Sequence, residues 1–365
     1  MGAPPYLCAM TQLADPLPLP SGAVLKNRFA LAPLTNTQSP DGGVLSDDEL
    51  RWLTMRAEGG FGLTMTCAAS VQEEGVGFPG QLGFHDDRHI PRLTLLADQI
   101  KRGGSLAIGQ LHHGGLRSMK DAKGPSADEK LKAQAMGLEE IQHSRDCFIA
   151  AARRAEAAGF DGVELHGAHG YLICSFLSPS LNRREDAYGG DAERRARFLF
   201  EIVDGIRAAT KPGFALGVRL SPERWGLDVL EIRDVAARLL REKQIDFLDL
   251  SLWDFRKEPE DEALKGRTLA SYFTELARGA IPVGAAGKIM SAADARDVLA
   301  MGFDFPVIGR AAILHHDFPN RAIADPAFTS RPIPASVETL AAEGISPTFI
   351  AYLRAFFPAL VEPAA

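Results

Sequence analysis

The sequence has few cysteines and no closely spaced pair of them. Four occur among its 365 residues, Cys8, Cys67, Cys147 and Cys174, and none belongs to a CxxC motif. Iron–sulfur clusters and structural zinc sites need thiolates close together, so this distribution argues against both and we expect no metal site. We interpret the four cysteines as free thiols of a protein in the reducing cytoplasm.

Long apolar runs and clusters of basic residues are also absent. No apolar stretch approaches the roughly 18 residues of a membrane-spanning helix, and the first ten residues lack the basic and apolar regions of a secretory signal. The net charge is −7 without any basic run. These absences predict a cytoplasmic protein with neither membrane nor nucleic acid as a partner.

The chain does contain a regular alternation of strand-like and helix-like patterns. The expected strands are residues 29–35, 61–70, 105–113, 163–166, 214–222, 245–251, 281–287 and 303–309. The expected helices are residues 47–58, 89–101, 139–158, 191–209, 229–239, 268–278, 291–301 and 336–354. Such units close into a (β/α)₈ TIM barrel, and we expect one domain over residues 1–365. An open doubly wound sheet is disfavoured because no GxGxxG motif follows the first strand.

Prolines mark two features outside this pattern. Pro16, Pro18 and Pro20 with the Ser21-Gly22 turn predict a small hairpin within residues 11–27 that caps one end of the barrel. Pro306 falls inside the eighth expected strand, although an interior strand normally uses every backbone N–H.

The fourth expected strand ends in polar side chains that a core strand would not need. His166, His169 and Tyr171 lie within six residues. Two imidazoles can donate hydrogen bonds to one oxygen and stabilise its developing negative charge, and a tyrosine nearby can supply a proton. Each histidine alone could be a satisfied core residue, but the trio together favours an enzyme that activates a carbonyl group.

Other expected strand ends carry residues suited to a bound cofactor. Active sites of TIM barrels form at the carboxyl ends of the strands. Gly287-Lys288 follows the seventh strand and Gly309-Arg310 the eighth, the usual place for a phosphate, because glycines expose backbone N–H groups and a cation adds charge. The remaining strand ends offer Thr35, Ala68, Gln110, His112 and Arg219.

Residues 166–190, HGAHGYLICSFLSPSLNRREDAYGG, resemble the signature of the old yellow enzyme family, the FMN-dependent ene-reductases. The resemblance extends over nearly the whole chain. It includes LKNRFALAPLT, AASVQEEG, GPSA, GVRLSP, PVGAAGKI and VIGRAAI. It implies a flavin oxidoreductase that takes hydride from NADPH or NADH and reduces the C=C bond of α,β-unsaturated carbonyl or nitro compounds.

The resemblance also assigns roles to single residues. His166 and His169 would bind the substrate's carbonyl oxygen, and Tyr171 would deliver a proton. Non-covalent FMN would contact Pro33, Thr35, Ala68, Gln110, Arg219, Ala286, Gly287, Lys288, Gly309 and Arg310. In these roles Gln110 pairs with the polar pyrimidine edge of the flavin, and Arg219 holds the negative charge of the reduced flavin.

Three positions depart from the family pattern. Many relatives have Arg at Asn36, and the family's HAGR is His113-Gly114-Gly115-Leu116 here, with Arg117 one place later. The carbonyl-binding pair is His-His rather than His-Asn; both pairs occur among relatives.

Two other functions remain open at this stage. The same loops could hold a phosphorylated substrate in a flavin-free barrel lyase or isomerase. Alternatively, the chain could be a flavin-binding sensor without catalysis.

The apolar C-terminal segment 352–360 is expected at a subunit interface of a homodimer or higher homo-oligomer. The alternative is that it packs under its own barrel.

Overall fold

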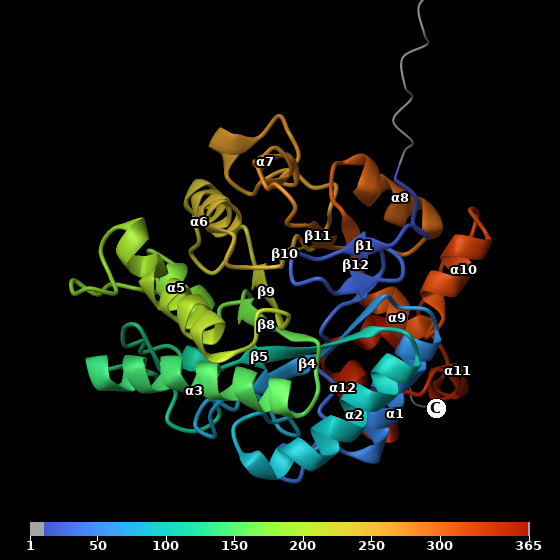
Figure 1. Cartoon of the computed structure of the whole chain (residues 1–365), viewed down its shortest axis with the longest axis horizontal. Coiled ribbons are helices and arrows are strands. Elements are labelled where there is room, and N and C mark those ends of the chain that lie inside the picture. The colour runs from blue at the N-terminus through green and yellow to red at the C-terminus, as the bar shows by residue number, and fades with distance from the viewer. Residues whose placement is uncertain (1–10, 364–365) are drawn as a thin grey trace, which may run out of the picture.

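A closed barrel of eight parallel strands lies at the centre of the computed structural model, which describes residues 11–363 (Figure 1). Its strands are β3 (Ala30–Leu31), β4 (Leu63–Ser70), β5 (Leu106–His112), β8 (Gly162–Gly167), β9 (Ala215–Leu220), β10 (Phe247–Ser251), β11 (Val283–Ala286) and β12 (Phe305–Ile308). They pair in chain order, and β12 closes the ring onto β3. The predicted (β/α)₈ barrel is confirmed.

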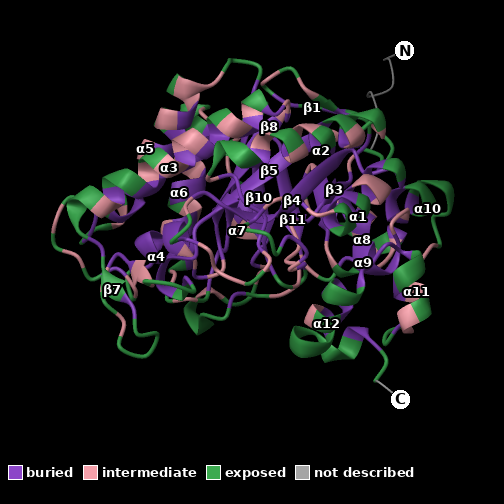
Figure 2. Ribbon diagram, turned by 90° about the horizontal axis from the view of Figure 1, so that it is seen from below, coloured by how far each residue is buried: buried purple, intermediate pink, exposed green. Residues whose placement is uncertain are grey.

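Helices surround the barrel, their inner faces buried and their outer faces exposed (Figure 2). Six match predicted segments closely: α1 (Asp47–Glu58), α2 (Ile90–Arg102), α3 (Leu138–Ala157), α5 (Ala192–Ala209), α6 (Val229–Glu242) and α8 (Ala292–Ala300). Shorter helices are α4 (Leu172–Leu177), α7 (Ser271–Thr274), α9 (Arg310–Leu314), α10 (Phe318–Ala324), α11 (Val337–Ala342) and α12 (Pro347–Phe356). No helix among residues 11–363 is long and apolar enough to cross a membrane.

The predicted N-terminal hairpin consists of β1 (Leu17–Pro18) and β2 (Val24–Leu25), with Leu17 opposite Leu25. Both leucines join a buried cluster with Met65 and Phe247, which closes the end of the barrel where the strands begin. The label β1 lies at the opposite side of Figure 2 from α12, so the hairpin and the C-terminal helices cover different ends. A second small ladder, β6 (Lys123–Gly124) with β7 (Gln134–Ala135), lies in the excursion after β5.

Three predicted elements are shorter than the sequence suggested. The strand predicted at 29–35 pairs only over Ala30–Leu31, because Pro33 has no N–H to continue the ladder. The helix predicted at 268–278 covers only Ser271–Thr274, since the N–H of Leu276 closes a tighter turn onto the carbonyl of Phe273. Pro306, by contrast, keeps its place in β12 opposite Ala285.

The helix predicted at 336–354 is two helices, α11 and α12. Gly344 has φ +78, a left-handed conformation that ends helices, and Pro347 occupies the first turn of α12. Ser346 caps α12 by accepting a hydrogen bond from the N–H of Phe349. The break lets α12 turn back over the barrel instead of extending away from it.

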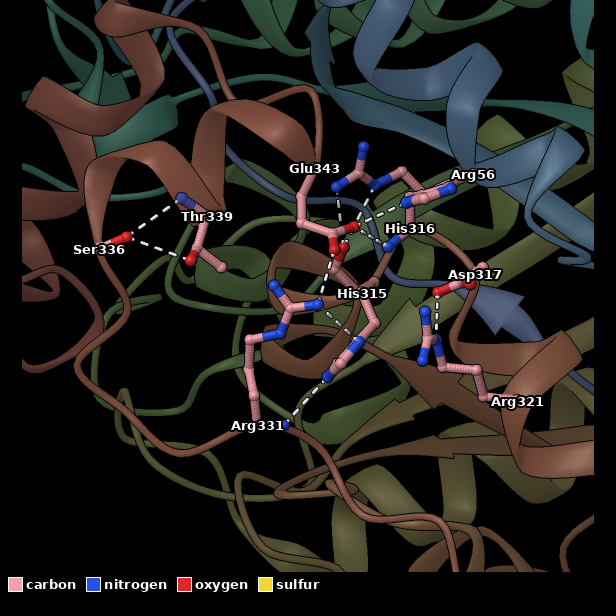
Figure 3. Close-up of polar contacts among 10 residues, drawn as sticks. Arg56, His315, His316, Asp317, Arg321, Arg331, Ser336, Thr339 and Glu343 are labelled. Atoms are coloured by element: carbon pink, nitrogen blue, oxygen red, sulfur yellow. Dashed lines mark hydrogen bonds and ion pairs between the residues drawn. The ribbon is translucent and has the colours of Figure 1, made fainter. Parts of the chain in front are cut away.

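Charged side chains fix this break to the barrel (Figure 3). We call Arg56, His316, Arg331 and Glu343 the C-terminal clamp. Glu343 Oε1 accepts from Arg331 Nη2 at 2.8 Å, and its Oε2 accepts from the backbone N–H and lies 2.7 Å from Nδ1 of His316. Arg56 of α1 donates to the carbonyl of Ala312 in α9. The clamp joins α1, α9 and α11, and thereby sets where α12 begins.

Candidate active site

The carboxyl ends of the barrel strands surround a cavity of about 670 Å³. Ligand pockets typically measure roughly 300–1,000 Å³. The thirteen residues predicted from the sequence as catalytic or cofactor-binding all line it. They are Pro33, Thr35, Ala68, Gln110, His166, His169, Tyr171, Arg219, Ala286, Gly287, Lys288, Gly309 and Arg310. The fold therefore brings the predicted site together, while the role of each residue remains a prediction.

Small side chains shape one part of this cavity. Ala32, Ala68 and Ala286 line it, and a Cβ on Gly309 would approach nothing closer than 3.9 Å. Such a surface leaves room for a flat ring system. Polar donors lie at Gln110 on β5 and Arg219 on β9, the two strands that flank β8, and the cations Lys288 and Arg310 follow β11 and β12. An aromatic ring with a polar edge and a phosphate tail fits this arrangement of donors.

The two histidines contact each other at the cavity wall. His169 Nδ1 lies 3.3 Å from His166 Nε2, and His169 Nε2 lies 2.7 Å from Ser251 Oγ. His169 has φ +62, which turns the chain sharply at the end of β8. Ser251, at the end of β10, was not among the predicted site residues. It fixes the orientation of the His169 ring, as second-layer hydrogen bonds do at many sites.

Burial keeps these imidazoles uncharged. It lowers the pKa of His166 well below the ordinary value, with His169 adding to the effect, and it lowers the pKa of His169 likewise, with Arg219 adding to it. The pKa of His112, whose ring lies 5.5 Å from that of His166, falls to about 3 for the same reason. At neutral pH the pair therefore offers hydrogen-bond donors and acceptors rather than positive charge.

Tyr171 sits between the histidines and an arginine that the sequence had left uncertain. Its ring centroid is 4.3 Å from that of His112, and the guanidinium of Arg117 lies 4.8 Å from its ring centroid. Arg117 also donates to the carbonyl of His169 at 2.9 Å. The one-place shift of this arginine relative to the family pattern therefore still leaves it at the cavity, where it braces Tyr171 and His169.

Asn36 and Leu116, which also depart from the family pattern, do not line the cavity. Asn36 is buried and binds Glu49, with Nδ2 to Oε1 at 2.9 Å. Ser39 donates to the second carboxylate oxygen, so the Glu49 side chain supports this loop, while its backbone N–H donates to Ser46 Oγ, which caps α1. Leu116 is buried against neighbouring residues, including Gly124.

Two acids beneath the cavity were missed. Glu164 and Asp249 face the barrel interior and are fully buried. Gln110 donates to Glu164 Oε1 at 2.7 Å, and Arg219 Nε lies 2.9 Å from Asp249 Oδ2. We call these four residues the barrel quartet. The strand pattern already placed Glu164 on the same face as His166, and the same alternation puts Asp249 on the face of Ser251.

The rim of the cavity carries large side chains that sequence reasoning did not identify. Trp225 and Trp253 line it, both with positive φ, 49 and 65, and their rings are 6.4 Å apart. Backbone strain of this kind persists where surrounding structure enforces it, often at functional sites. The two tryptophans narrow the entrance beside His169, whose ring is 5.5 Å from that of Trp225.

The C-terminal segment reaches the cavity of its own barrel. Tyr352, Leu353, Phe357 and Leu360 line it, and burial raises the pKa of Tyr352 while a hydrogen bond with Thr35 opposes that rise. Phe356 points elsewhere and is 68 % exposed. The segment thus contacts its own barrel at the cavity rather than under it, and its place at a subunit interface stays a prediction.

Comparisons with known proteins give this geometry a context. Residues 12–325 match the model of the NADH:flavin oxidoreductase / NADH oxidase family. YqiG of Bacillus subtilis, a probable NADH-dependent flavin oxidoreductase, is 37 % identical over 318 residues, 83 % of this chain and 85 % of that protein. The old yellow enzyme homologue of Zymomonas mobilis superposes with a TM-score of 0.78 at 26 % identity, covering 92 % of this chain and 99 % of that one.

Some relatives are much longer. The NADH:fumarate oxidoreductase of Klebsiella pneumoniae is 31 % identical over 342 residues, which cover 86 % of this chain but 36 % of that protein. The chain spans about a third of that relative's length, so the likeness concerns one part of a larger enzyme.

Proposed function

This chain belongs to the NADH:flavin oxidoreductase / NADH oxidase family, whose members bind FMN, and from that premise we propose that it is an ene-reductase. Its substrates would be α,β-unsaturated carbonyl or nitro compounds, and its reductant NADPH or NADH. The observation that carries the proposal is the meeting of His166, His169 and Tyr171 on one wall of a cavity that also holds the predicted flavin-binding residues.

Non-covalent FMN suits the donors in the cavity. Gln110 offers an amide to the polar edge of the ring system, and Arg219 offers positive charge beside it. Thr35 offers a hydroxyl. Gly287, Gly309 and Arg310 offer backbone N–H groups and a cation to the phosphate, the usual arrangement after the last two strands of a TIM barrel. FMN, when bound, would receive hydride from NAD(P)H and pass it to the β-carbon of the substrate.

The histidine pair would hold the substrate's oxygen. Neutral imidazole donors placed in a buried site stabilise negative charge that develops on a carbonyl or nitro oxygen. Ser251 and Arg117 keep the His169 ring and backbone in position. In the structure each ring nitrogen of His169 already has a partner, Nδ1 with His166 and Nε2 with Ser251. For this role one of the two nitrogens would also have to bind the substrate oxygen.

Tyr171 would protonate the α-carbon. Its hydroxyl belongs to a residue that begins α4, just beyond the histidines, and its ring is held between His112 and Arg117. General-acid catalysis of this kind contributes typically about 10²–10⁴-fold. The rate of substrate reduction would therefore depend on this hydroxyl, whereas reduction of the protein by NAD(P)H would not.

The decisive experiment combines cofactor identification with turnover. Purified protein should be yellow, release FMN on heat denaturation, and oxidise NADPH or NADH faster when cyclohexenone is added. A protein that binds no added FMN would support the flavin-free lyase or isomerase instead. Bound FMN without enone-dependent oxidation by either coenzyme would support the flavin-binding sensor.

A further inference from the structure

One side of the barrel interior carries charge where TIM barrels usually pack branched apolar residues. Gln110 and Glu164 are cross-strand partners on β5 and β8, and Arg219 and Asp249 are cross-strand partners on β9 and β10. All four residues are at most 5 % exposed. Gln110 and Arg219 also line the cavity, whereas the two acids lie beneath it.

The charges of the barrel quartet do not cancel if both acids are ionised. One guanidinium then faces two carboxylates, with only a neutral amide beside them. A net negative charge in a buried site is costly, and proteins avoid it by keeping a proton on one of the acids. Geometry indicates which acid that is, because the carboxylate of Asp249 contacts Arg219 and that of Glu164 does not.

Glu164 is the better place for the proton. Its Oε1 accepts from Gln110, and its Oε2 has no hydrogen-bond partner among residues 11–363. Burial and the charge of Asp249 raise the pKa of Glu164 to about 8, opposed by Arg219 and Gln110. Burial also raises the pKa of Asp249, and Arg219 opposes that rise. The quartet is then a neutral acid, an amide and a balanced ion pair.

The ion pair with Asp249 affects how strongly Arg219 attracts an anionic ligand in the cavity. An arginine without a counter-ion would strongly favour an anionic ligand above it, while one already paired with a carboxylate favours it less. Two-electron reduction of a flavin leaves additional negative charge on its ring. The pairing with Asp249 therefore weakens the preference of the site for the reduced cofactor and keeps the cofactor a strong hydride donor.

We propose that Asp249 is a positioning residue that lowers the midpoint potential of the bound flavin through Arg219, and that Glu164 keeps the barrel quartet neutral by retaining a proton. The proposal rests on FMN occupying the cavity, as in the proposed function. It does not depend on which substrate is reduced, so redox titration of the holoenzyme can test it even if enone turnover fails.

The first test compares two buried aspartates near β10. Asp249→Asn removes the counter-ion of Arg219 and should favour the reduced flavin by about 10–100-fold, a rise in midpoint potential of about 30–60 mV for a two-electron couple. Asp246→Asn is the matched control, because Asp246 is buried and paired with Arg207 at 2.5 Å but does not line the cavity. Its potential should equal that of the wild type. If the potential of Asp249→Asn also equals that of the wild type, Asp249 does not have this role.

The second test concerns the proton on Glu164, and its first part, on the apoprotein, needs no flavin. At pH 6 the infrared spectrum of the apoprotein should contain the carbonyl stretch of a protonated carboxyl group, lost in Glu164→Gln and retained in Asp246→Asn. In the wild-type holoenzyme the midpoint potential should fall more steeply as the pH rises through about 8, where Glu164 ionises. Glu164→Gln should lack that step. A Glu164→Gln spectrum and pH profile identical to wild type would place the proton elsewhere and overturn this part, even if Asp249→Asn fails to fold.

Discussion

The barrel quartet and the C-terminal clamp are both clusters of polar and ionisable side chains, but their hydrogen bonding differs. In the clamp, each oxygen of Glu343 has a close partner, from Arg331 or His316. In the quartet, Glu164 Oε2 and both carboxylate oxygens of Asp249 have no hydrogen-bond partner among residues 11–363, and Asp249 meets Arg219 as an ion pair only. The clamp is a saturated hydrogen-bond network that fixes helices. The quartet lies beneath a cavity, and some of its carboxyl oxygens have unused hydrogen-bonding capacity.

Their environments explain the contrast. The clamp lies at the edge of the molecule, where His316 and Arg331 remain partly exposed and Glu343 is nearly buried. Burial would raise the pKa of Glu343, but hydrogen bonds from the side chain and backbone of His316, with Arg331 adding to them, lower it to about 2. Inside the barrel, burial dominates and raises the pKa of both acids. The same residue types thus stabilise the fold in the clamp, whereas in the quartet they retain a proton and a buried ion pair.

The largest expected effect is at the cavity above the quartet. Tyr171→Phe removes one hydroxyl and keeps the ring between His112 and Arg117. The enone half-reaction should slow by about 10²–10⁴-fold, or roughly 3–5 kcal/mol, while reduction by NAD(P)H stays near the wild-type rate. Stopped-flow measurement of the two half-reactions separates them. An unchanged enone half-reaction would mean that another group is the proton donor.

Next comes removal of the quartet's only cation. Arg219→Leu leaves Asp249 without its counter-ion inside the barrel, which should cost about 3–5 kcal/mol in the free energy of unfolding, as for other broken buried pairs. Denaturant unfolding of the apoprotein at pH 7 measures it. The double variant Arg219→Leu/Asp249→Leu should recover much of the loss. If the single variant is as stable as wild type, the quartet does not hold the charge distribution inferred here.

Clamp variants should have a smaller effect and a different pH dependence. Glu343→Gln loses ionic hydrogen bonds worth about 1–3 kcal/mol at pH 7. Because the pKa of Glu343 is lowered in the folded protein, its contribution is complete above the ordinary value of 4.5 and disappears as the pH falls toward about 2. The thermal unfolding temperatures of wild type and variant should therefore converge over that range. The midpoint potential of the bound flavin should be the same in both proteins. A difference in stability that persists at pH 2 would contradict this origin.

The smallest effect on stability is expected outside both clusters. Phe356 is 68 % exposed, so Phe356→Ser should change the free energy of unfolding by no more than about 0.5 kcal/mol. If the C-terminal segment forms a subunit interface, the same change should shift assembly to smaller species in sedimentation velocity. Leu353→Ser, by contrast, should destabilise the fold because Leu353 is buried. Unchanged assembly in Phe356→Ser would argue against this residue as an interface contact.

Much of the fold was readable from local patterns. Ser46 and Asp191 cap α1 and α5 where the sequence predicted these helices. The alternation of strands and helices predicted the barrel, since parallel strands require crossover helices. Local patterns failed where a single residue breaks a regular element, as Gly344 does between α11 and α12 and as Pro33 does at the end of β3.

The candidate site divides in a similar way. His166, His169 and Tyr171 were recognisable because they follow one another along the chain, and the glycine loops because they follow the last two strands. Ser251 and Asp249 on β10, and Tyr352 on α12, carry no such local signal, because their partners lie on other elements.

The sequence by itself determined the barrel, the family and the residues that meet at its mouth, because periodicity and motif order are local properties of the chain. Only the tertiary structure decided which charges are balanced. Whether Glu164 keeps a proton depends on burial and on Arg219 and Asp249, which lie 55 and 85 positions further along the chain. Electrostatic energy depends on distance and solvent exposure, and folding sets both.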